Sequence, residues 1–251
     1  MVLKRYHHLP KLLWLILLGM TVTPSFAQTQ NPATATPGIN RCLGSFSGNS
    51  ATVTGSCTYY LLPDSGGSGG APVQGTYYSG QLVNGQPNGT GVLVYANRDR
   101  YEGQFRNGLP NGRGLFIFAN DDRYEGEFIN GLPNGNGTFI FANGSRYTGQ
   151  VRNGQQNGNG TFIFANGDRY EGQFVNGVVR GSGTFTFRDG SSCRATFFGS
   201  DLSGRGDCRL PQGARYSGEL RGSVPHGVGV LTLANGTVFR GQFRNGQPLR
   251  P

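Results

Sequence analysis

Residues 124–146 read Y-E-G-E-F-I-N-G-L-P-N-G-N-G-T-F-I-F-A-N-G-S-R, and closely similar stretches precede and follow them. The first residue of each stretch lies 23 residues after the first residue of the one before it. These first positions are Tyr78, Tyr101, Tyr124, Tyr147, Tyr170, Cys193, Tyr216 and Phe239. In the units from residue 78 to residue 192, positions 3, 8, 12 and 14 are always glycine. A fixed period of this length indicates an array of structural repeats.

Each unit has the pattern of a β-hairpin. In residues 124–128 (Y-E-G-E-F), aromatic and glycine residues alternate with glutamates, and this period of two is typical of a strand. Residues 138–141 (T-F-I-F) form a second β-prone run. The turn residues of 129–137 predict a hairpin loop, and those of 142–144 (A-N-G) predict a tight turn to the next hairpin. The predicted fold is all-β: an elongated, single-layer antiparallel meander of 23-residue β-hairpin repeats.

The aromatic residues are expected on one face of this sheet. Positions 1 and 5 share a face, as do positions 16 and 18, and glycine at position 3 predicts room for a ring from the neighbouring strand. Ring pairs add about 0.5–1.5 kcal/mol beyond burial, so this stripe is expected to stabilise the fold. The opposite face is hydrophilic and mixed in charge sign. The stripe comprises Tyr101, Phe105, Phe116, Phe118, Tyr124, Phe128, Phe139, Phe141, Tyr147, Phe162, Phe164, Tyr170 and Phe174.

The four cysteines fall at equivalent positions of two atypical units. Cys193 and Cys208 occupy positions 1 and 16, where tyrosine and phenylalanine stand elsewhere. Cys42 begins a copy of the position 1–5 pattern, and Cys57 again falls at position 16. Four cysteines permit three connectivities, and the shared register favours the disulfides Cys42–Cys57 and Cys193–Cys208. A zinc site needs cysteines two to four residues apart, and this spacing is absent. We predict no metal site and no cofactor.

The N-terminus is typical of a secretory signal peptide. A basic segment precedes an apolar run at residues 12–20, which is shorter than the roughly 20 residues needed to span a bilayer. The small residues that follow predict cleavage between Ala27 and Gln28, with an uncleaved N-terminal anchor as the alternative. We expect an exported protein of the bacterial periplasm, extracellular space or cell envelope, where disulfides persist.

Composition and period divide the chain into segments. They are a signal peptide at 1–27, a flexible linker at 28–41, a degenerate N-terminal unit with a Gly/Ser-rich loop insertion at 42–77 and a repeat array at 78–251. The array consists of units 78–100, 101–123, 124–146, 147–169, 170–192, a degenerate unit 193–215, a unit 216–238 and a half unit 239–251.

The motif at residues 124–137 resembles the MORN (membrane occupation and recognition nexus) repeat. The MORN pattern is Tyr-Glu-Gly-Glu-Trp/Phe-x-Asn-Gly-x-x-x-Gly-x-Gly with a 23-residue period. The resemblance covers residues 78–247 and, weakly, residues 42–63. It implies an elongated single-layer sheet of hairpins, with roles in scaffolding, self-association and, in some members, attachment to phospholipid membranes.

Residues with catalytic chemistry are few and scattered. We expect His226 in a hairpin loop, exposed to solvent. Glu102, Glu125 and Glu171 recur at position 2 and are expected to form a surface row, whereas a glycosidase needs two carboxylates that flank one bond. No P-loop, H-E-x-x-H or nucleophile-elbow motif is present. We therefore predict no catalytic residues and no enzyme; an envelope hydrolase is the third-ranked alternative.

Arginine recurs at positions 23 and 6 in a chain of formal net charge +9. The resulting arginine ladder is Arg100, Arg106, Arg123, Arg146, Arg152, Arg169, Arg215, Arg221 and Arg244. It is suited to anionic headgroups, acidic polysaccharide or another envelope polymer, with an affinity that falls with salt; the alternative is a solubilising surface with weak ion pairs. Nucleic acid is not expected.

We therefore predict a non-enzymatic, exported scaffold or binding module at the cell envelope, with a protein or an envelope polymer as its partner. The alternative is peripheral binding to anionic phospholipid membranes through the arginine ladder. The terminal strand at Phe239 is also suited to pairing with another copy of the chain.

Overall fold

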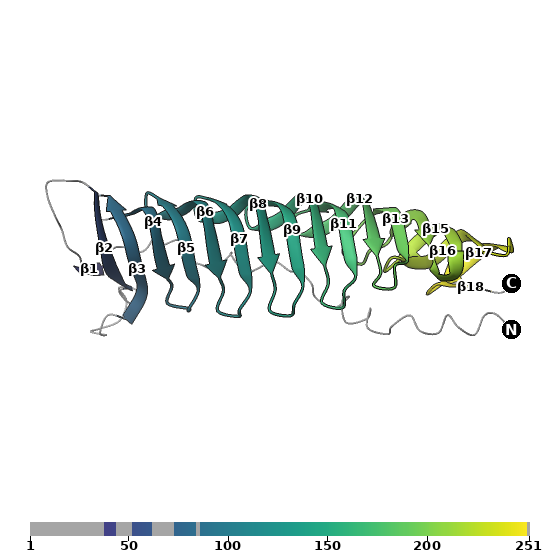
Figure 1. Ribbon diagram of the computed structural model, residues 1–251, viewed down its shortest axis with the longest axis horizontal. Helices are drawn as coiled ribbons and strands as arrows, with labels where there is room; N and C mark the ends of the chain where they lie inside the picture. Colours follow the sequence, from purple (N-terminus) through teal and green to yellow (C-terminus); the bar gives the residue numbers. More distant parts are fainter. Residues whose placement is uncertain (1–37, 44–51, 62–72, 84–85, 250–251) are drawn as a thin grey trace, which may run out of the picture. The chain divides into compact units, whose positions relative to one another are not determined.

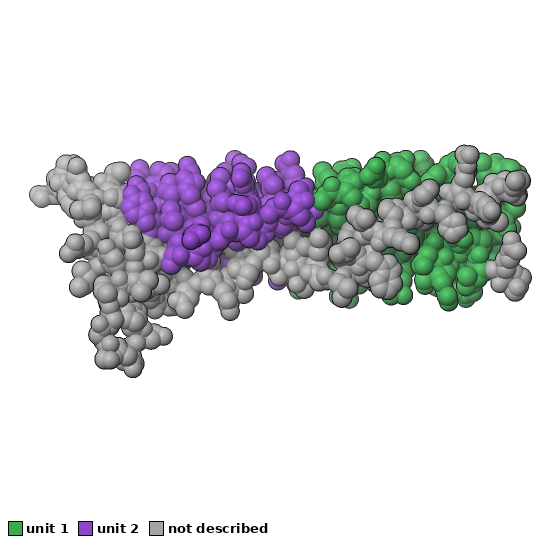
Figure 2. All heavy atoms as spheres, turned by 90° about the horizontal axis from the view of Figure 1, so that it is seen from below, with its two compact units in different colours: residues 1–23, 156–251 green, residues 24–155 purple. Residues whose placement is uncertain are grey.

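The computed structural model describes residues 38–43, 52–61, 73–83 and 86–249. The chain divides into two compact units, residues 24–155 and residues 1–23 with 156–251 (Figure 2). The predicted signal peptide with its cleavage site, and most of the Gly/Ser-rich insertion, lie outside the described residues. Within the described part, no helix is long and apolar enough to cross a membrane.

The unit of residues 24–155 is a meander in which each strand pairs antiparallel with the next (Figure 1). Its strands are β1 (Gly38–Leu43), β2 (Thr52–Leu61), β3 (Val73–Val83), β4 (Gln86–Val94), β5 (Arg100–Arg106), β6 (Leu109–Ile117), β7 (Arg123–Ile129), β8 (Leu132–Ile140) and β9 (Arg146–Arg152). Residues 38–41, which we predicted as linker, belong to β1.

The unit that includes residues 156–251 repeats the same arrangement, again with consecutive strands paired antiparallel. Its elements are β10 (Gln155–Ile163), β11 (Arg169–Val175), β12 (Val178–Thr186), β13 (Ser192–Phe197), β14 (Gly204–Arg209), the 3-10 turn η3 (Pro211–Gly213), β15 (Arg215–Arg221), β16 (Val224–Thr232), β17 (Val238–Arg244) and β18 (Gln247–Pro248). The prediction of an all-β antiparallel meander of 23-residue hairpins is confirmed.

The loop within each hairpin is shorter than the sequence suggested. In the unit at 124–146 it consists of Asn130 and Gly131, whose φ angles are 50° and 84°. Two positive φ angles in an Asn-Gly pair are typical of a type I′ turn, which matches the twist of paired strands. Strand β8 follows at once, so the prediction of a loop up to residue 137 was wrong. The later glycines of that stretch lie within the strand, where they make room for side chains.

The turn between hairpins is where the sequence placed it. The N–H of Gly144 donates to the carbonyl of Phe141 at 2.9 Å and closes the turn. Aspartates at position 22 link successive turns, since Asp122 Oδ1 accepts the N–H of Ala142 at 2.8 Å. Asp99 and Asp168 make the equivalent bonds to the turns that follow them.

Tyrosine at position 1 lies flat over two glycines. A Cβ atom on Gly103 would lie 2.6 Å from the hydroxyl of Tyr101, and one on Gly114 would overlap the same ring. We expected the ring over position 3 to come from the neighbouring strand, and this was wrong. The ring belongs to the same strand, two residues earlier, because a side chain that leans along its strand covers position i+2 on the same face.

The tyrosine hydroxyl completes a β-bulge at position 4. The pairing of β5 with β6 shifts between Gly103 and Phe105, which leaves the backbone of Gln104 outside the ladder. Tyr101 Oη donates to the Gln104 carbonyl at 2.9 Å, and Gln104 Oε1 accepts the N–H of Arg113 at 2.9 Å. The same tyrosine bond, at 2.6–3.2 Å, recurs in Tyr78, Tyr124, Tyr147, Tyr170 and Tyr216.

The aromatic rings interlock between units and form the core. The ring centroid of Tyr101 lies 5.0 Å from that of Phe105 in its own unit and 4.8 Å from that of Phe128 in the next, edge-on in both cases. The residues of the predicted aromatic stripe are buried, apart from the half-buried Phe164. We call this side of each sheet the aromatic face and the opposite side the polar face.

Candidate binding surface

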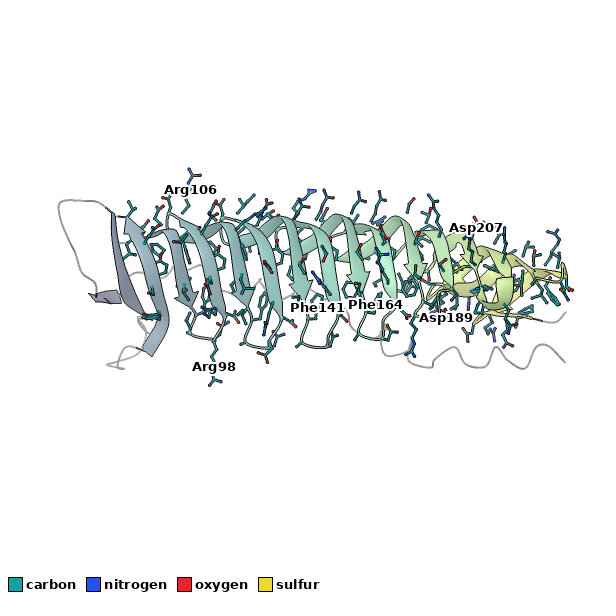
Figure 3. The ribbon with its side chains drawn as sticks, in the orientation of Figure 1. Arg98, Arg106, Phe141, Phe164, Asp189 and Asp207 are labelled. Atoms are coloured by element: carbon teal, nitrogen blue, oxygen red, sulfur yellow. A yellow bond between two sulfur atoms is a disulfide. The ribbon has the colours of Figure 1, made fainter. Side chains whose placement is uncertain are left out.

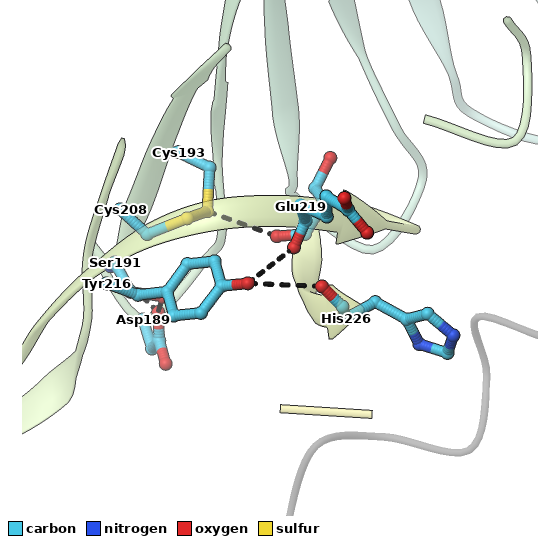
Figure 4. The surroundings of a disulfide bond; sticks show 8 residues. Asp189, Ser191, Cys193, Cys208, Tyr216, Glu219 and His226 are labelled. Atoms are coloured by element: carbon cyan, nitrogen blue, oxygen red, sulfur yellow. Dashed lines mark hydrogen bonds between the residues drawn. A yellow bond between two sulfur atoms is a disulfide. The ribbon is translucent and has the colours of Figure 1, made fainter. Parts of the chain in front are cut away.

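A disulfide replaces the aromatic pair in the degenerate unit (Figure 4). Cys193 in β13 and Cys208 in β14 are register partners and form a disulfide. Cys42 and Cys57 are likewise partners in the register of β1 and β2, and a disulfide between them stays a prediction. The Cys193–Cys208 disulfide links adjacent strands on the aromatic face, away from the polar face.

His226 does not lie in a hairpin loop, as we expected, but in β16, where it is half-buried. Its backbone carbonyl accepts a hydrogen bond from Tyr216 Oη at 3.1 Å, and its imidazole points away from that tyrosine (Figure 4). Among the residues that the structure describes, the buried Nδ1 has no hydrogen-bond partner. Among the described residues no group of three or more His, Cys, Asp or Glu side chains is placed to hold a metal ion.

Burial raises the pKa of the core tyrosines, which therefore stay neutral phenols and hydrogen-bond donors. For Tyr170 and Tyr216 the loss of hydration raises the pKa to about 12, and the backbone bond each hydroxyl donates lowers it only in part. The pKa of Tyr101, Tyr124 and Tyr147 is raised further for the same reason. These hydroxyls serve the fold.

The polar face carries the exposed charges. It presents positions 23, 2 and 4 of one strand beside positions 17, 15 and 13 of the next, as in the pairing of β5 with β6. Arg100 and Glu102 form an ion pair at 2.7 Å, and Arg169 and Glu171 form the same pair at 2.7 Å. All four side chains are substantially exposed, so each pair contributes little to stability. The predicted row of surface glutamates therefore lies beside the arginines of position 23.

The arginine ladder separates into two rows. The position 23 arginines begin the first strand of their hairpins, and the position 6 arginines end it beside the hairpin turn. This turn is Asn-Gly after Arg106, Arg152 and Arg244 and Gly-Ser after Arg221. Arg106 projects outward near this turn (Figure 3). A strand of this length holds Arg100 and Arg106 about 20 Å apart. All nine residues are exposed except Arg100, which is half-buried.

Four arginines outside the ladder lie on the polar face of the compact unit that contains residues 156–251. They were not among the residues predicted from the sequence. Arg194 and Arg240 occupy position 2, where the regular repeats have glutamate, threonine or serine, and Arg205 and Arg209 lie in β14. Superposing the degenerate unit on the regular pattern would have found them, because arginine at position 2 breaks the alternation of charge.

The chain was compared with known proteins. A family model of the MORN repeat matches residues 78–100, 101–123, 124–146, 147–169, 170–192 and 216–238. No curated protein matches the chain. A solved structure similar to it is the TCP domain of SAS-4 (dCPAP) from Drosophila melanogaster in complex with a proline-rich motif of Ana2 (dSTIL). The identity is 18% and the TM-score 0.38, over 60% of this chain and 82% of that one.

Another is the TCP10 domain of Danio rerio CPAP in complex with a peptide of Danio rerio STIL. The identity is 14% and the TM-score 0.42, over 74% of this chain and 81% of that one. At these TM-scores neither likeness carries an argument about function.

Proposed function

Because the chain belongs to the MORN repeat family, we propose that it is an exported, non-enzymatic scaffold or binding module of the cell envelope with a protein as its main partner. The observation that supports this is the difference in exposure between the two faces. The side chains of the aromatic face are buried in the core, whereas the polar face presents a regular, exposed array of arginine, glutamate and glutamine. An array of this kind is suited to a partner with complementary charge.

Binding is tested with the purified chain as bait in an envelope extract, followed by reconstitution with the purified partner. Charge reversal of the polar face is expected to abolish stoichiometric binding. The reversed variant carries Glu102→Arg, Glu125→Arg and Glu171→Arg. Arg188→Gln, in an exposed turn outside the polar face of the strands, is a control for position and should bind normally. A partner that binds the reversed variant equally well, or no stoichiometric partner at all, contradicts the proposal.

Export is tested separately. If residues 1–27 are a signal peptide, N-terminal sequencing of the protein from the envelope fraction gives Gln28 as the first residue. A first residue of Met1 would favour the uncleaved anchor, and recovery of the protein only from the cytosol would contradict export.

Peripheral membrane binding is the second candidate, supported by the exposure of the arginine ladder. Flotation with anionic vesicles should then recover the chain at low salt and not at high salt. The variant with Arg106→Gln and Arg152→Gln should float less well. Flotation that is insensitive to salt, or absent, excludes this candidate.

An envelope hydrolase is the third candidate, with His226 as its candidate catalytic base. Within the described part of the chain, its imidazole nitrogen Nδ1 lacks the carboxylate or carbonyl acceptor that orients a catalytic base. The His226→Ala variant is expected to keep every binding activity and phenotype of the parent chain.

Self-association through the terminal strands stays a prediction that sedimentation analysis checks.

A further inference from the structure

The polar face of strands β13–β17 is hollowed, and arginines surround the hollow. Two adjoining depressions of about 430 and 510 Å³ share Asp207, Ser217 and Val230 in their floors. We call this region the arginine groove; its charged residues are Arg194, Arg205, Asp207, Arg209, Arg215 and Arg240. It lies wholly within the unit that contains residues 156–251.

The strand register fixes the layout of the groove. Arg194 is the partner of Asp207, which is the partner of Ser217 in the next strand. Ser217 is in turn the partner of Val230, and Val230 is the partner of Arg240. This row crosses five strands, so at about 4.8 Å per strand its two terminal arginines lie about 19 Å apart.

A second row flanks the first and adds more arginine. Arg209 and Arg215 are register partners, and Ser192 and Thr232 continue the row on either side. On the other flank of Asp207, Arg205 faces Glu219. Five arginines therefore accompany two acidic residues on this part of the polar face.

These five arginines are uncompensated. In the regular units two of the polar-face arginines at position 23, Arg100 and Arg169, pair with the glutamate at position 2. Among the residues the structure describes, none of the five groove arginines lies within 4.0 Å of a carboxylate. Glu219 accepts the N–H of Val228 at 3.3 Å, which fixes it beside the backbone. A concave surface with unpaired guanidinium groups attracts anions and offers them bidentate hydrogen bonds.

The groove constrains the form of the anion. Its arginines are spread along about 19 Å, which requires a ligand with several separated anionic groups. Between them lie the Asp207 carboxylate and the Ser217 hydroxyl, both exposed, which suit ligand hydroxyl groups. A carboxylate in the floor also repels a ligand with closely spaced negative charges.

Other polyanions fit this surface less well. The polar-face residues of β13–β17 include no aromatic side chain on which the bases of single-stranded nucleic acid stack. Strands β13–β16 are paired on both sides, so an acidic peptide finds no free strand edge to extend.

We propose that the arginine groove binds an acidic polysaccharide, with sugar carboxylates on the arginines and sugar hydroxyls on Asp207 and Ser217. The groove differs from the arginine ladder, with which it shares only Arg215. Its ligand is separate from the protein partner of the proposed function, so either idea can fail without the other.

The test uses the purified chain and a defined probe, oligogalacturonate of about twelve sugars, in isothermal titration calorimetry. The variant with Arg194→Gln and Arg240→Gln removes both ends of the central row and is expected to bind at least tenfold more weakly. The matched control carries Arg98→Gln and Arg113→Gln, which remove the same charge from two exposed arginines of residues 86–155 that lie outside the arginine ladder. It is expected to bind within about twofold of the parent chain.

Four outcomes overturn the proposal. They are absence of binding, equal binding of the fully methyl-esterified oligomer, an equal loss of affinity in the control variant, and tighter binding of anionic vesicles or single-stranded DNA at the same groove. Because all the substituted arginines are exposed, circular dichroism should find both variants folded. A variant that is unfolded is replaced by Arg194→Lys with Arg240→Lys, whose loss of bidentate geometry should weaken binding about threefold or more.

Discussion

The repeat of residues 101–123 and the repeat of residues 193–215 have the same strand register but different side chains at positions 1 and 16. The first places Tyr101 opposite Phe116, and the second places a disulfide at the same two positions. Glycine at positions 3 and 14 lets the tyrosine ring lie on the backbone, whereas Ala195 stands at position 3 of the second unit, where no ring needs the space. The residues that fill the aromatic face therefore change as a set.

The polar face differs between the same two regions in another way. Arg100 is paired with Glu102. Arg194 occupies the position of that glutamate in the degenerate unit, and no carboxylate of the described residues lies within 4.0 Å of it. Nothing on the aromatic face requires this exchange, because the two faces share only the backbone. The aromatic face thus carries the stability of the fold, and the polar face is free to vary with the ligand.

The largest expected effect comes from closing the space under a tyrosine ring. In Gly137→Val, the new side chain would overlap the ring of Tyr124, so the ring must leave the core and its hydroxyl loses the bond to the Glu127 carbonyl. We expect a loss of more than about 4 kcal/mol of unfolding free energy in urea titration. Gly144→Ala, in an open turn with φ of 87°, is the control and should cost about 1 kcal/mol. Equal costs would refute the role of the ring.

Removal of the disulfide is the next largest effect and acts only in the degenerate unit. Cys193→Ser with Cys208→Ser opens a link across 15 residues, and loop closure of this length is worth about 3 kcal/mol. In a background with Cys42→Ser and Cys57→Ser, a reducing agent should destabilise the chain that keeps Cys193 and Cys208 by the same amount. It should leave the chain that lacks all four cysteines unchanged. If these two chains respond alike to the reductant, the disulfide has no part in stability.

A third experiment converts the degenerate unit into a regular one. Cys193→Tyr with Cys208→Phe should fold poorly, because the methyl group of Ala195 occupies the place of the ring. Adding Ala195→Gly should recover about 2 kcal/mol, the usual size of an overpacking penalty. The midpoint of urea unfolding measures both variants. No gain from Ala195→Gly would mean that the ring and position 3 are not coupled.

The sequence predicted the parts of the fold that depend on local pattern. The period, the strand order and the turn at 142–144 followed from it, because turn residues and side-chain alternation act over a few residues. The bulge at Gln104 was not predictable, since it appears only when two strands are paired. The arginine groove was missed for a related reason: its central row joins residues as far apart in sequence as Arg194 and Arg240.

Alkaline pH should distinguish the two kinds of unit. Burial holds the pKa of Tyr170 at about 12, above the 10.0 of an exposed phenol. The folded state therefore favours the neutral form: its stabilising effect is complete below pH 10 and is lost as the pH rises from 10 to about 12. Unfolding midpoints at pH 9 and pH 11.5 should differ, and less so in Tyr170→Phe. The degenerate repeat has Cys193 at position 1 and contributes no such pH dependence. A chain whose unfolding free energy stays constant up to pH 12 would contradict the stabilising role of the buried tyrosines in the regular repeats.

The smallest effects are expected on the polar face. Glu102→Gln removes the exposed ion pair with Arg100, and such pairs contribute less than about 0.5 kcal/mol. Arg194→Gln should be as mild, because that arginine has no acidic partner to lose. Thermal unfolding of both variants beside the parent chain measures the difference. A loss above about 1 kcal/mol in either would tie the polar face to folding. If both variants lose little stability while Arg194→Gln weakens the binding of oligogalacturonate, the charged residues of the polar face act in ligand binding and not in folding.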